Sequence, residues 1–283
     1  MNDLAEINQL EKKVDDFQLG PIDLTIEAGT ITALVGTNGS GKSTLLKLMM
    51  NLAKADTGNI QVHNRFVNGP DEGWKTTIAY QPQTVIGWNA FTGSTLRDFI
   101  APLYPAWDEN QFKKVVQALQ VPLNKRFGKL SQGMQQKLTL ALTIARNTSI
   151  LLLDEPTAFM DIPSKQRLMN ILTEWMESGD RAIVISTHQV DDIMKLADYL
   201  CVLQDGKWLG TYEKETIQHM YCKYWMRDAL PSETLPGEVS REAKQFITNK
   251  PAAAEKYLQD EQLQWVNQQT LDLEESLTLL LNK

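Results

Sequence analysis

The residues from Gly36 to Thr44 form a glycine-rich segment that could hold a chain of phosphate groups. They fit the pattern G-x-x-x-x-G-K-[ST], in which glycines let successive backbone N–H groups turn inward and surround anionic oxygens. Lys42 is expected to contact the β- and γ-phosphates, and the Ser43 hydroxyl to complete the coordination of Mg²⁺. The residues assigned to the nucleotide are Gly36, Thr37, Asn38, Gly39, Ser40, Gly41, Lys42, Ser43 and Thr44.

The sequence on either side of this segment supports the same interpretation. An apolar run, Ile31–Val35, leads in, and a helical pattern of apolar residues follows from Leu45 to Leu52. A helix that starts here would add the positive end of its dipole to the phosphate site. The alternative, an ordinary glycine-rich turn, does not require this strand–loop–helix setting. The sequence therefore predicts a nucleoside triphosphate site.

A second segment, Leu151–Glu155, supplies the carboxylates that such a site needs. A buried strand that ends in a carboxylate would hold Asp154 rigidly where it can bind Mg²⁺, directly or through water. Glu155 is expected to project to the other side of the pleat and to polarise an attacking water. The alternative is a plain strand followed by a polar turn, which the upstream phosphate segment makes the weaker interpretation.

The elements that position these residues alternate between strands and helices, which predicts an α/β fold with a phosphate-loop NTPase core of mixed sheet and helices. Asp205-Gly206 predicts a hairpin turn, and Asp108 followed by Gln111 predicts a helix cap. Strands are expected within the ranges Ile22–Ile26, Ile31–Val35, Ile60–Val62, Ile78–Tyr80, Ile150–Leu153 and Ala182–Ile185.

We expect residues 1–212 to form one nucleotide-binding cassette, with an antiparallel β subdomain and a helical subdomain inserted at about residues 84–147. Residues 213–283 are expected to form a small C-terminal appendage of undetermined role, in which Pro231, Pro236 and Pro251 separate short helical stretches. The segment from Leu273 to Leu281 ends the chain as an apolar-rich stretch.

Composition limits the classes of function. The net charge of −7 gives no electrostatic case for a nucleic acid partner. The polar N-terminal residues predict that there is no signal peptide, and no apolar run approaches the roughly 20 residues that cross a bilayer. Cys201 and Cys222 have no metal-ligand spacing, so buried thiols are expected. Work at a membrane would need a separate anchor.

The segment Leu130–Leu138, with the sequence LSQGMQQKL, resembles the signature motif of the ABC ATPases. The other motifs of that family follow in matching order: the phosphate loop, a glutamine loop at residues 80–83, the signature, Leu151–Glu155, Asp161 and His188. The resemblance covers residues from about 4 to 212. The variant S-x-G-M-x-Q-K-L, with YPAWDENQF upstream, is similar to nucleotide-binding subunits of bacterial drug, antibiotic or peptide exporters that pair with separate permeases.

The resemblance implies a role for each matching residue. Gln83 would contact Mg²⁺ and sense the γ-phosphate, with Gln81 as a rival assignment. Ser131 and Gly133 would open a helix that faces the γ-phosphate bound to the opposite subunit; the weaker alternative is that Ser131 is a plain helix cap. His188 would hold the γ-phosphate and the attacking water, and Asp161 would lie in the loop that communicates between subunits.

The chain departs from the family pattern at three places. Gln132 replaces the glycine at the centre of the signature, and Ala158–Asp161 reads A-F-M-D where S-G-L-D is usual. The position of the aromatic residue that normally stacks on adenine aligns with Val14, and Phe17 is the nearest aromatic residue. Two alternatives follow: stacking on adenine is weak, or Phe17 supplies it, and on the second alternative Phe17 is assigned to the nucleotide site.

The resemblance implies an ATP-hydrolysing, Mg²⁺-dependent subunit at the cytoplasmic face of the membrane, bound peripherally to an integral membrane permease. A second ATP-binding subunit, identical or related, would meet it head to tail around ATP, and no nucleic acid partner is implied. Two alternatives are a soluble ABC ATPase without a transport role and a regulatory subunit that hydrolyses ATP only weakly.

Overall fold

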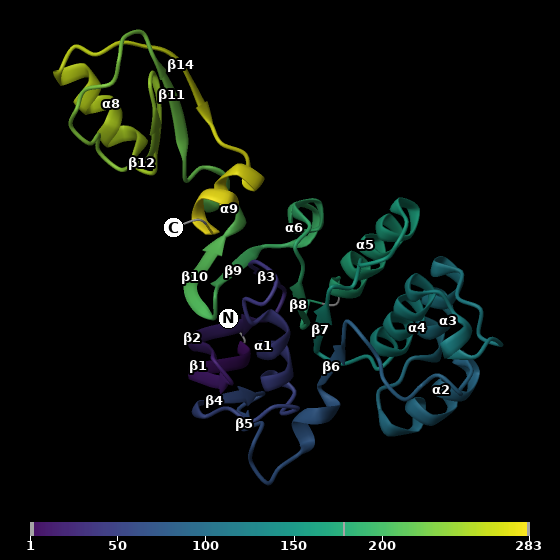
Figure 1. Cartoon of the computed structure of the whole chain (residues 1–283). Coiled ribbons are helices and arrows are strands. Elements are labelled where there is room, and N and C mark those ends of the chain that lie inside the picture. The colour runs from purple at the N-terminus through teal and green to yellow at the C-terminus, as the bar shows by residue number, and fades with distance from the viewer. Residues whose placement is uncertain (1–2, 178, 282–283) are drawn as a thin grey trace. The chain divides into compact units, whose positions relative to one another are not determined.

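The structure, a computed structural model, describes residues 3–177 and 179–281. These residues divide into two compact units, of which the first ends at Thr211 and the second begins at Tyr212 (Figure 1). Each unit has its own buried core, and within the described residues the first unit contains two sheets and the second contains one. Within the described ranges, no helix is both long and apolar enough to cross a membrane.

In the described part of the first unit, six strands form the central sheet in the order β10-β9-β3-β8-β7-β6. The pairs β9–β3, β3–β8, β8–β7 and β7–β6 are parallel, so the carboxyl ends of these strands meet at one edge. Every residue of β7 and β8 is buried, as their continuous apolar runs predict. The strands are β3 (Ile31–Val35), β6 (Ile78–Gln81), β7 (Ile150–Asp154), β8 (Ala182–Ser186), β9 (Tyr199–Gln204) and β10 (Lys207–Glu213).

The predicted hairpin between β9 and β10 is confirmed. Asp205 and Gly206 connect the two strands and have φ values of 47° and 81°. A two-residue type I′ turn requires positive φ at both positions, and Asp-Gly is a dipeptide that accepts it.

A second, antiparallel sheet of the first unit has the order β2-β1-β4-β5 within the described residues. Its strands are β1 (Asp3–Val14), β2 (Phe17–Glu27), β4 (Thr57–Val62) and β5 (Arg65–Phe66). The sequence pattern predicted strands within β2 and β4 but did not predict β1. The register of β1 against β2 shifts between Ile7 and Leu10 and again before Lys12, and these irregularities break the two-residue alternation that marks a strand.

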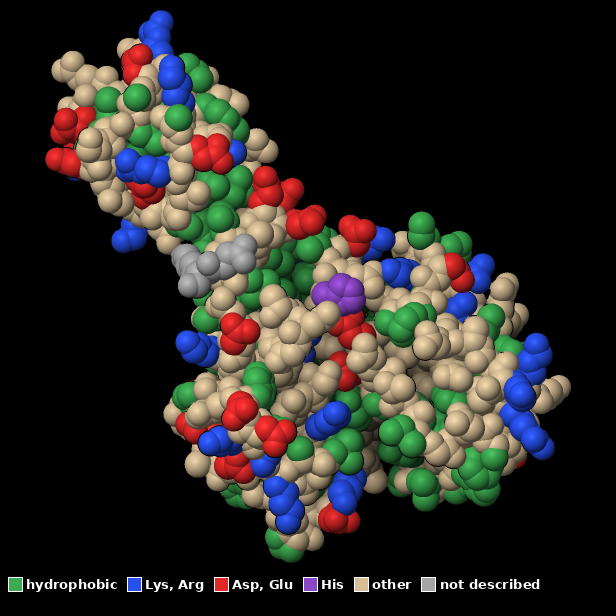
Figure 2. Space-filling view, viewed as in Figure 1, with side chains coloured by type: hydrophobic (Ala, Val, Ile, Leu, Met, Phe, Trp, Pro, Cys, Tyr) green, Lys and Arg blue, Asp and Glu red, His purple; other side chains and the backbone are tan. Residues whose placement is uncertain are grey.

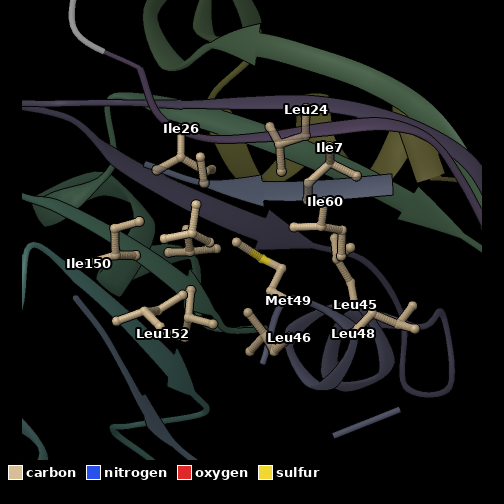
Figure 3. Packing of buried hydrophobic residues seen from close by; sticks show 14 of the residues in the cluster. Ile7, Leu24, Ile26, Leu45, Leu46, Leu48, Met49, Ile60, Ile150 and Leu152 are labelled. Atoms are coloured by element: carbon tan, nitrogen blue, oxygen red, sulfur yellow. The ribbon is translucent and has the colours of Figure 1, made fainter. Parts of the chain in front are cut away.

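Helix α1 (Lys42–Met49) packs into a core that is shared by both sheets (Figure 3). Leu45, Leu46, Leu48 and Met49 are buried on it. In Figure 3 these side chains face Ile7, Leu24 and Ile60 of the antiparallel sheet, and Ile150 and Leu152 of the central sheet. The position of the helix start, and with it that of the phosphate segment, is therefore fixed by apolar packing against both sheets.

Between β6 and β7 the chain is helical. Helices α2 (Gly93–Ile100), α3 (Glu109–Leu119) and α4 (Gln132–Ile144) lie in this region, and α3 and α4 contact each other. The predicted cap is present, since Asp108 accepts a hydrogen bond of 2.9 Å from the Gln111 amide. Helices α5 (Ile162–Met176) and α6 (Val190–Leu196) follow β7 and β8. Figure 1 shows α4 and α5 on the side of the central sheet away from α1.

The second unit contains short helices, as expected after residue 213, but it also contains a sheet that the sequence pattern did not predict. Its described strands form an antiparallel sheet in the order β12-β13-β11-β14, and helix α8 packs on it through Ala254 and Leu258. The strands are short and often polar, as in the stretch from Trp265 to Thr270, so they gave no clear strand pattern. The elements are α7 (Lys214–Gln218), β11 (Cys222–Met226), β12 (Glu238–Glu242), β13 (Gln245–Thr248), α8 (Pro251–Asp260), β14 (Trp265–Thr270) and α9 (Leu273–Leu281).

The two cysteines are buried and unbonded to each other, as their spacing predicted. Cys201 lies in β9 of the first unit, and Cys222 lies in β11 of the second. Burial raises the pKa of the Cys201 thiol to about 12, so it is protonated at neutral pH and unreactive.

The shared core of the first unit yields a stability prediction. Met49 is completely buried between the two sheets, whereas Leu52, just past the same helix, is 66% exposed. Met49→Ala should lower the free energy of unfolding by about 2–5 kcal/mol, because the truncation removes apolar contacts and leaves a cavity. Leu52→Ala should cost about 0.5 kcal/mol or less. Urea unfolding curves of the two variants compare them directly, and equal losses would contradict this account of the core.

Candidate nucleotide-binding site

The phosphate segment connects β3 to α1 at the carboxyl edge of the central sheet. Gly41 directly precedes the helix with a φ of 106°, a conformation that favours glycine, and a Cβ atom there would come within 2.6 Å of Leu19 and 3.1 Å of Phe17. A cavity of about 430 Å³ opens beside the segment. The residues that line it are Val14, Phe17, Asn38, Gly39, Gly41, Lys42, Ser43, Thr44, Gln83 and Glu155.

Lys42 is largely buried at the start of α1, and its ammonium group donates to the carbonyl oxygens of Gly36 and Thr37 at 2.8 and 2.9 Å. Burial lowers the pKa of the Lys42 side chain, and the negative charges of Glu155 and Asp154 oppose that shift. The Lys42 ammonium group is thus hydrogen-bonded to carbonyl groups of the phosphate segment itself. Phosphate oxygens in the cavity would be stronger, charge-assisted acceptors for it.

Asp154 ends β7 and is almost completely buried. Its carboxylate accepts hydrogen bonds from Ser43 at 3.0 Å, from Ser186 at 2.6 Å and from Tyr80 at 3.3 Å. Burial, and then the charge of Asp154, raise the pKa of the Tyr80 phenol, so it remains a donor. A buried carboxylate and a hydroxyl group beside a phosphate loop are oxygen ligands of the kind that Mg²⁺ prefers, so the residues fit this ion.

Glu155 lies just beyond β7, and its position differs from the expected one. Its φ of 50° places the backbone in the left-handed region, so the pleat of the strand does not continue through it. The side chain instead lines the cavity beside the phosphate segment. His188 Nδ1 lies 2.9 Å from Glu155 Oε2, while the imidazole is more than half exposed. The structure therefore brings a buried carboxylate and an accessible imidazole together at the cavity.

The two candidate glutamines occupy different environments. Gln81 is fully buried at the end of β6, where its side-chain amide donates to the Pro82 carbonyl. Gln83 lines the cavity beside the phosphate segment, and it also lines a neighbouring cavity of about 250 Å³ together with Gln132 and Phe159. Position therefore favours Gln83 over Gln81 as the residue that reaches the nucleotide.

Val14 and Phe17 flank the turn between β1 and β2, and both line the cavity. Val14 is 46% exposed, whereas Phe17 is partly buried against the core and adjoins Gly41. Either side chain could meet a base at this end of the cavity, but the aromatic ring of Phe17 offers the larger flat surface for stacking.

Ser131 and Gly133 do not line the cavity beside the phosphate segment. Ser131 caps α4, with its hydroxyl oxygen accepting from the Met134 amide at 3.3 Å. The simple capping role considered for Ser131 is therefore present. Gly133 follows in the first turn of α4, so these two residues are available at a helix start outside this chain's own phosphate cavity.

Asp161 begins α5 and is held to α4. It accepts from the Ser164 amide at 2.7 Å, which lowers the pKa of the Asp161 carboxyl to about 2. The Lys137 ammonium group lies 3.5 Å from its other carboxylate oxygen. The A-F-M-D segment thus still ends in an aspartate that caps a helix, despite its departure from the family pattern.

Sequence reasoning did not identify Tyr80 or Ser186 as members of the site. Ser186 ends β8 and Tyr80 is the penultimate residue of β6, and both strands pair with β7, so the topology places their hydroxyl groups at the same edge of the sheet as Asp154. A polar residue at the end of a buried strand was the available signal, because ligand sites in such sheets gather at this edge.

Comparisons with known proteins agree with this geometry. Residues 19–158 match a family model described as ABC transporter. The ABC transporter ATP-binding protein YtrB of Bacillus subtilis is 29% identical over 224 residues, which cover 79% of this chain and 76% of YtrB. The galactose/methyl galactoside import ATP-binding protein MglA of Clostridium tetani is 29% identical over 84% of this chain, but the match spans only 51% of MglA.

The fold also matches solved structures. A dimeric ATP-binding cassette in a post-hydrolysis state, bound to ADP and Pi, gives a TM-score of 0.64 at 21% identity, covering 74% of this chain and 98% of that one. At this identity the likeness establishes the α/β fold. The family match and the ATP-binding relative, together with the phosphate loop and the carboxylates of Asp154 and Glu155, show that the chain carries an ATP-binding domain of the ABC transporter family, an ATPase domain that uses ATP and Mg²⁺.

Proposed function

We propose that this protein is the ATP-hydrolysing subunit that drives an ABC transporter through a separate membrane permease. The observation that carries the proposal is the convergence of Lys42, Ser43, Asp154, Glu155 and His188 at one edge of the sheet. These five residues could bind the phosphate groups, coordinate the metal ion and accept a proton. Phosphoryl transfer needs little else from a protein.

In this proposal the loop and Lys42 bind the triphosphate. The Lys42 ammonium group exchanges the carbonyl oxygens of Gly36 and Thr37 for phosphate oxygens, which are stronger acceptors because they are charged. Ser43 and Asp154 would hold Mg²⁺, and Gln83 lines the same cavity from the loop after β6. An ion held there would supply positive charge that offsets the charge of the phosphate groups.

In the proposed function, Glu155 is the general base of ATP hydrolysis. Its carboxylate orients a water molecule and accepts its proton, while His188 contacts the γ-phosphate and helps to hold that water. His188 Nδ1 lies 2.9 Å from Glu155 Oε2, so the two side chains are close enough to act together in the proposed reaction.

A second cassette completes the site. Ser131 and Gly133 lie at the start of α4, outside this chain's own cavity, so they serve the ATP of an opposing subunit in a head-to-tail pair. The backbone N–H groups at a helix start bind anions such as the γ-phosphate. The dimeric cassette among the similar structures supports a paired arrangement.

The helical region of the first unit supports a permease as the partner. Figure 2 shows hydrophobic side chains gathered on the lower right surface, over the region of α2. Helix α2 and the turn that follows it carry large exposed apolar side chains, among them Phe99, which is 59% exposed, and Leu103, which is 70% exposed. Such a surface fits a protein partner. Binding to the permease would place this chain at the cytoplasmic face of the membrane.

The direction of transport does not follow from the nucleotide site. The signature variant resembles that of drug, antibiotic or peptide exporters, but MglA, with 29% identity, is named an import protein. The relatives therefore do not support export over import. Transport assays in vesicles that contain the permease determine the direction and the substrate.

Two measurements test the proposal as a whole. Co-purification with a multi-helix membrane protein distinguishes a transporter subunit from a soluble ABC ATPase. Steady-state hydrolysis of Mg-ATP, measured on that complex, distinguishes a motor subunit from a regulatory subunit that scarcely turns over.

Lys42→Ala should weaken ATP binding itself. The variant loses a charge-assisted contact, and such contacts contribute about 1.5–3 kcal/mol, which corresponds to roughly a 10- to 100-fold weaker affinity. Titration with ATP and Mg²⁺ gives the dissociation constant. Lys47→Ala, on the same helix but outside the cavity lining, is the control; if both variants bind like the unmodified protein, the role of Lys42 is rejected.

Glu155→Gln should preserve ATP binding and lower turnover by at least about 100-fold, because the amide cannot accept the proton of the attacking water. The variant should also accumulate as an ATP-bound dimer, since the step that opens the dimer no longer occurs. Hydrolysis assays and size exclusion with Mg-ATP check both outcomes. Persistent turnover in a monomeric variant would be incompatible with this role.

Phe17→Ala should weaken ATP binding by about 1–3 kcal/mol if its ring stacks on the adenine, as aromatic side chains do on bases. Val14→Ala, at the other end of the same turn, should cost much less because it removes no aromatic surface. Comparing the affinities for ATP and for inorganic triphosphate shows how much of each loss comes from contacts with the nucleoside, which inorganic triphosphate lacks. A larger loss for Val14→Ala would assign the base contact to Val14 instead.

A further inference from the structure

Helix α4 is attached to the loop that carries Glu155 through a row of contacts. Gln136, which is 5% exposed, donates its side-chain amide to the Glu155 carbonyl oxygen at 3.0 Å. A Cβ atom on Gly133 would lie 2.5 Å from the Phe159 carbonyl oxygen, so the loop also packs directly against the helix backbone there. Lys137 reaches Asp161 at the end of the same loop. The loop therefore depends on α4 for its position.

The loop needs such support because its backbone is strained. Glu155 and Phe159 have φ values of 50° and 61°, in the left-handed region that residues with a Cβ atom adopt unfavourably. A conformation of this kind persists when surrounding contacts enforce it, and such strain gathers at functional sites. With this backbone conformation, Glu155 does not continue the pleat of β7, and its side chain lines the phosphate cavity.

The backbone amide and the backbone carbonyl of Glu155 both form hydrogen bonds. On the amino side, the Glu155 amide donates to the Ser186 carbonyl oxygen at 3.1 Å and approaches the Ser186 hydroxyl at 3.2 Å. On the carboxyl side, the Glu155 carbonyl oxygen accepts from Gln136. Ser186 belongs to the rigid central sheet, whereas Gln136 belongs to the helical region, so the backbone of Glu155 is held between two different parts of the unit.

We propose that Gln136 is a positioning residue for ATP hydrolysis, which fixes the strained backbone of Glu155 and thereby the direction of its carboxylate. Gln136 does not line the phosphate cavity, so it acts on the reaction through Glu155 and not through the nucleotide. The inference rests on the proposed role of Glu155 as general base. It also ties that carboxylate to the helix that begins at the signature segment, because Gln136 lies one turn after Gly133.

The test compares Gln136→Met with the unmodified protein, using the complex or preparation in which hydrolysis is measurable. Methionine has a similar length and packs in apolar surroundings, but it cannot donate to the Glu155 carbonyl. Turnover should fall by roughly 10- to 100-fold, as expected for a misplaced catalytic group. The KM and the dissociation constant for ATP should stay within about twofold, and the ATP-induced dimer should still form.

Thr139→Val is the matched control. Thr139 is buried on the same helix, and its hydroxyl donates to the Gln135 carbonyl within the helix instead of to the Glu155 loop. This variant should keep its turnover. The melting temperatures of both variants show whether either substitution lowers the stability of the fold. A similar loss of turnover in Thr139→Val would show that general packing of α4 matters, which would overturn the specific role of Gln136.

A second comparison uses the Glu155→Gln background in single-turnover assays. Adding Gln136→Met there should cause no further loss, because the group that Gln136 positions has already been removed. An additive loss would overturn the inference, as would a Gln136→Met variant with unchanged turnover. An unmodified protein that fails to hydrolyse ATP would instead contradict the proposed function, so the two failures can be distinguished.

Discussion

The buried carboxylate of Asp154 is the point on which the rest of the site depends. A carboxylate taken out of water is costly unless its oxygens accept hydrogen bonds, and here the donors are Ser43, Tyr80 and Ser186. These donors come from α1, β6 and β8, so a single charge joins the start of the helix after the phosphate loop to both neighbours of β7. The Asp154 carboxylate and the hydroxyl groups around it thus place several oxygen atoms next to the phosphate cavity.

In the proposed function, the loop after Asp154 supplies the catalytic carboxylate. Its left-handed residue, Glu155, directs a second carboxylate toward the same cavity, and His188 approaches it from the loop after β8. The contacts of Gln136 and Gly133 hold that loop against α4. In the proposed function, the helix that presents the signature segment to another subunit also supports the general base of its own subunit.

Much of the site could be predicted from the sequence because it is built from short, local patterns. The glycines and Lys42 lie within one segment, and Asp154 ends a continuous apolar run of the kind that buried parallel strands have. The second unit could not be predicted in the same way. Its strands are short, and β14 carries mostly polar residues, so the pairing partners and not the local pattern determine that they are strands.

The sequence by itself determined that this protein binds a nucleoside triphosphate and that its first unit has an α/β fold, because residue type and spacing dictate the loop, the strand ends and the helix caps. Only the tertiary structure separated Gln83 from Gln81, placed Ser186 and Tyr80 on Asp154, and turned Glu155 away from the pleat. Those outcomes depend on which strands pair and which helix packs where, and contacts between residues far apart in the chain leave no local pattern.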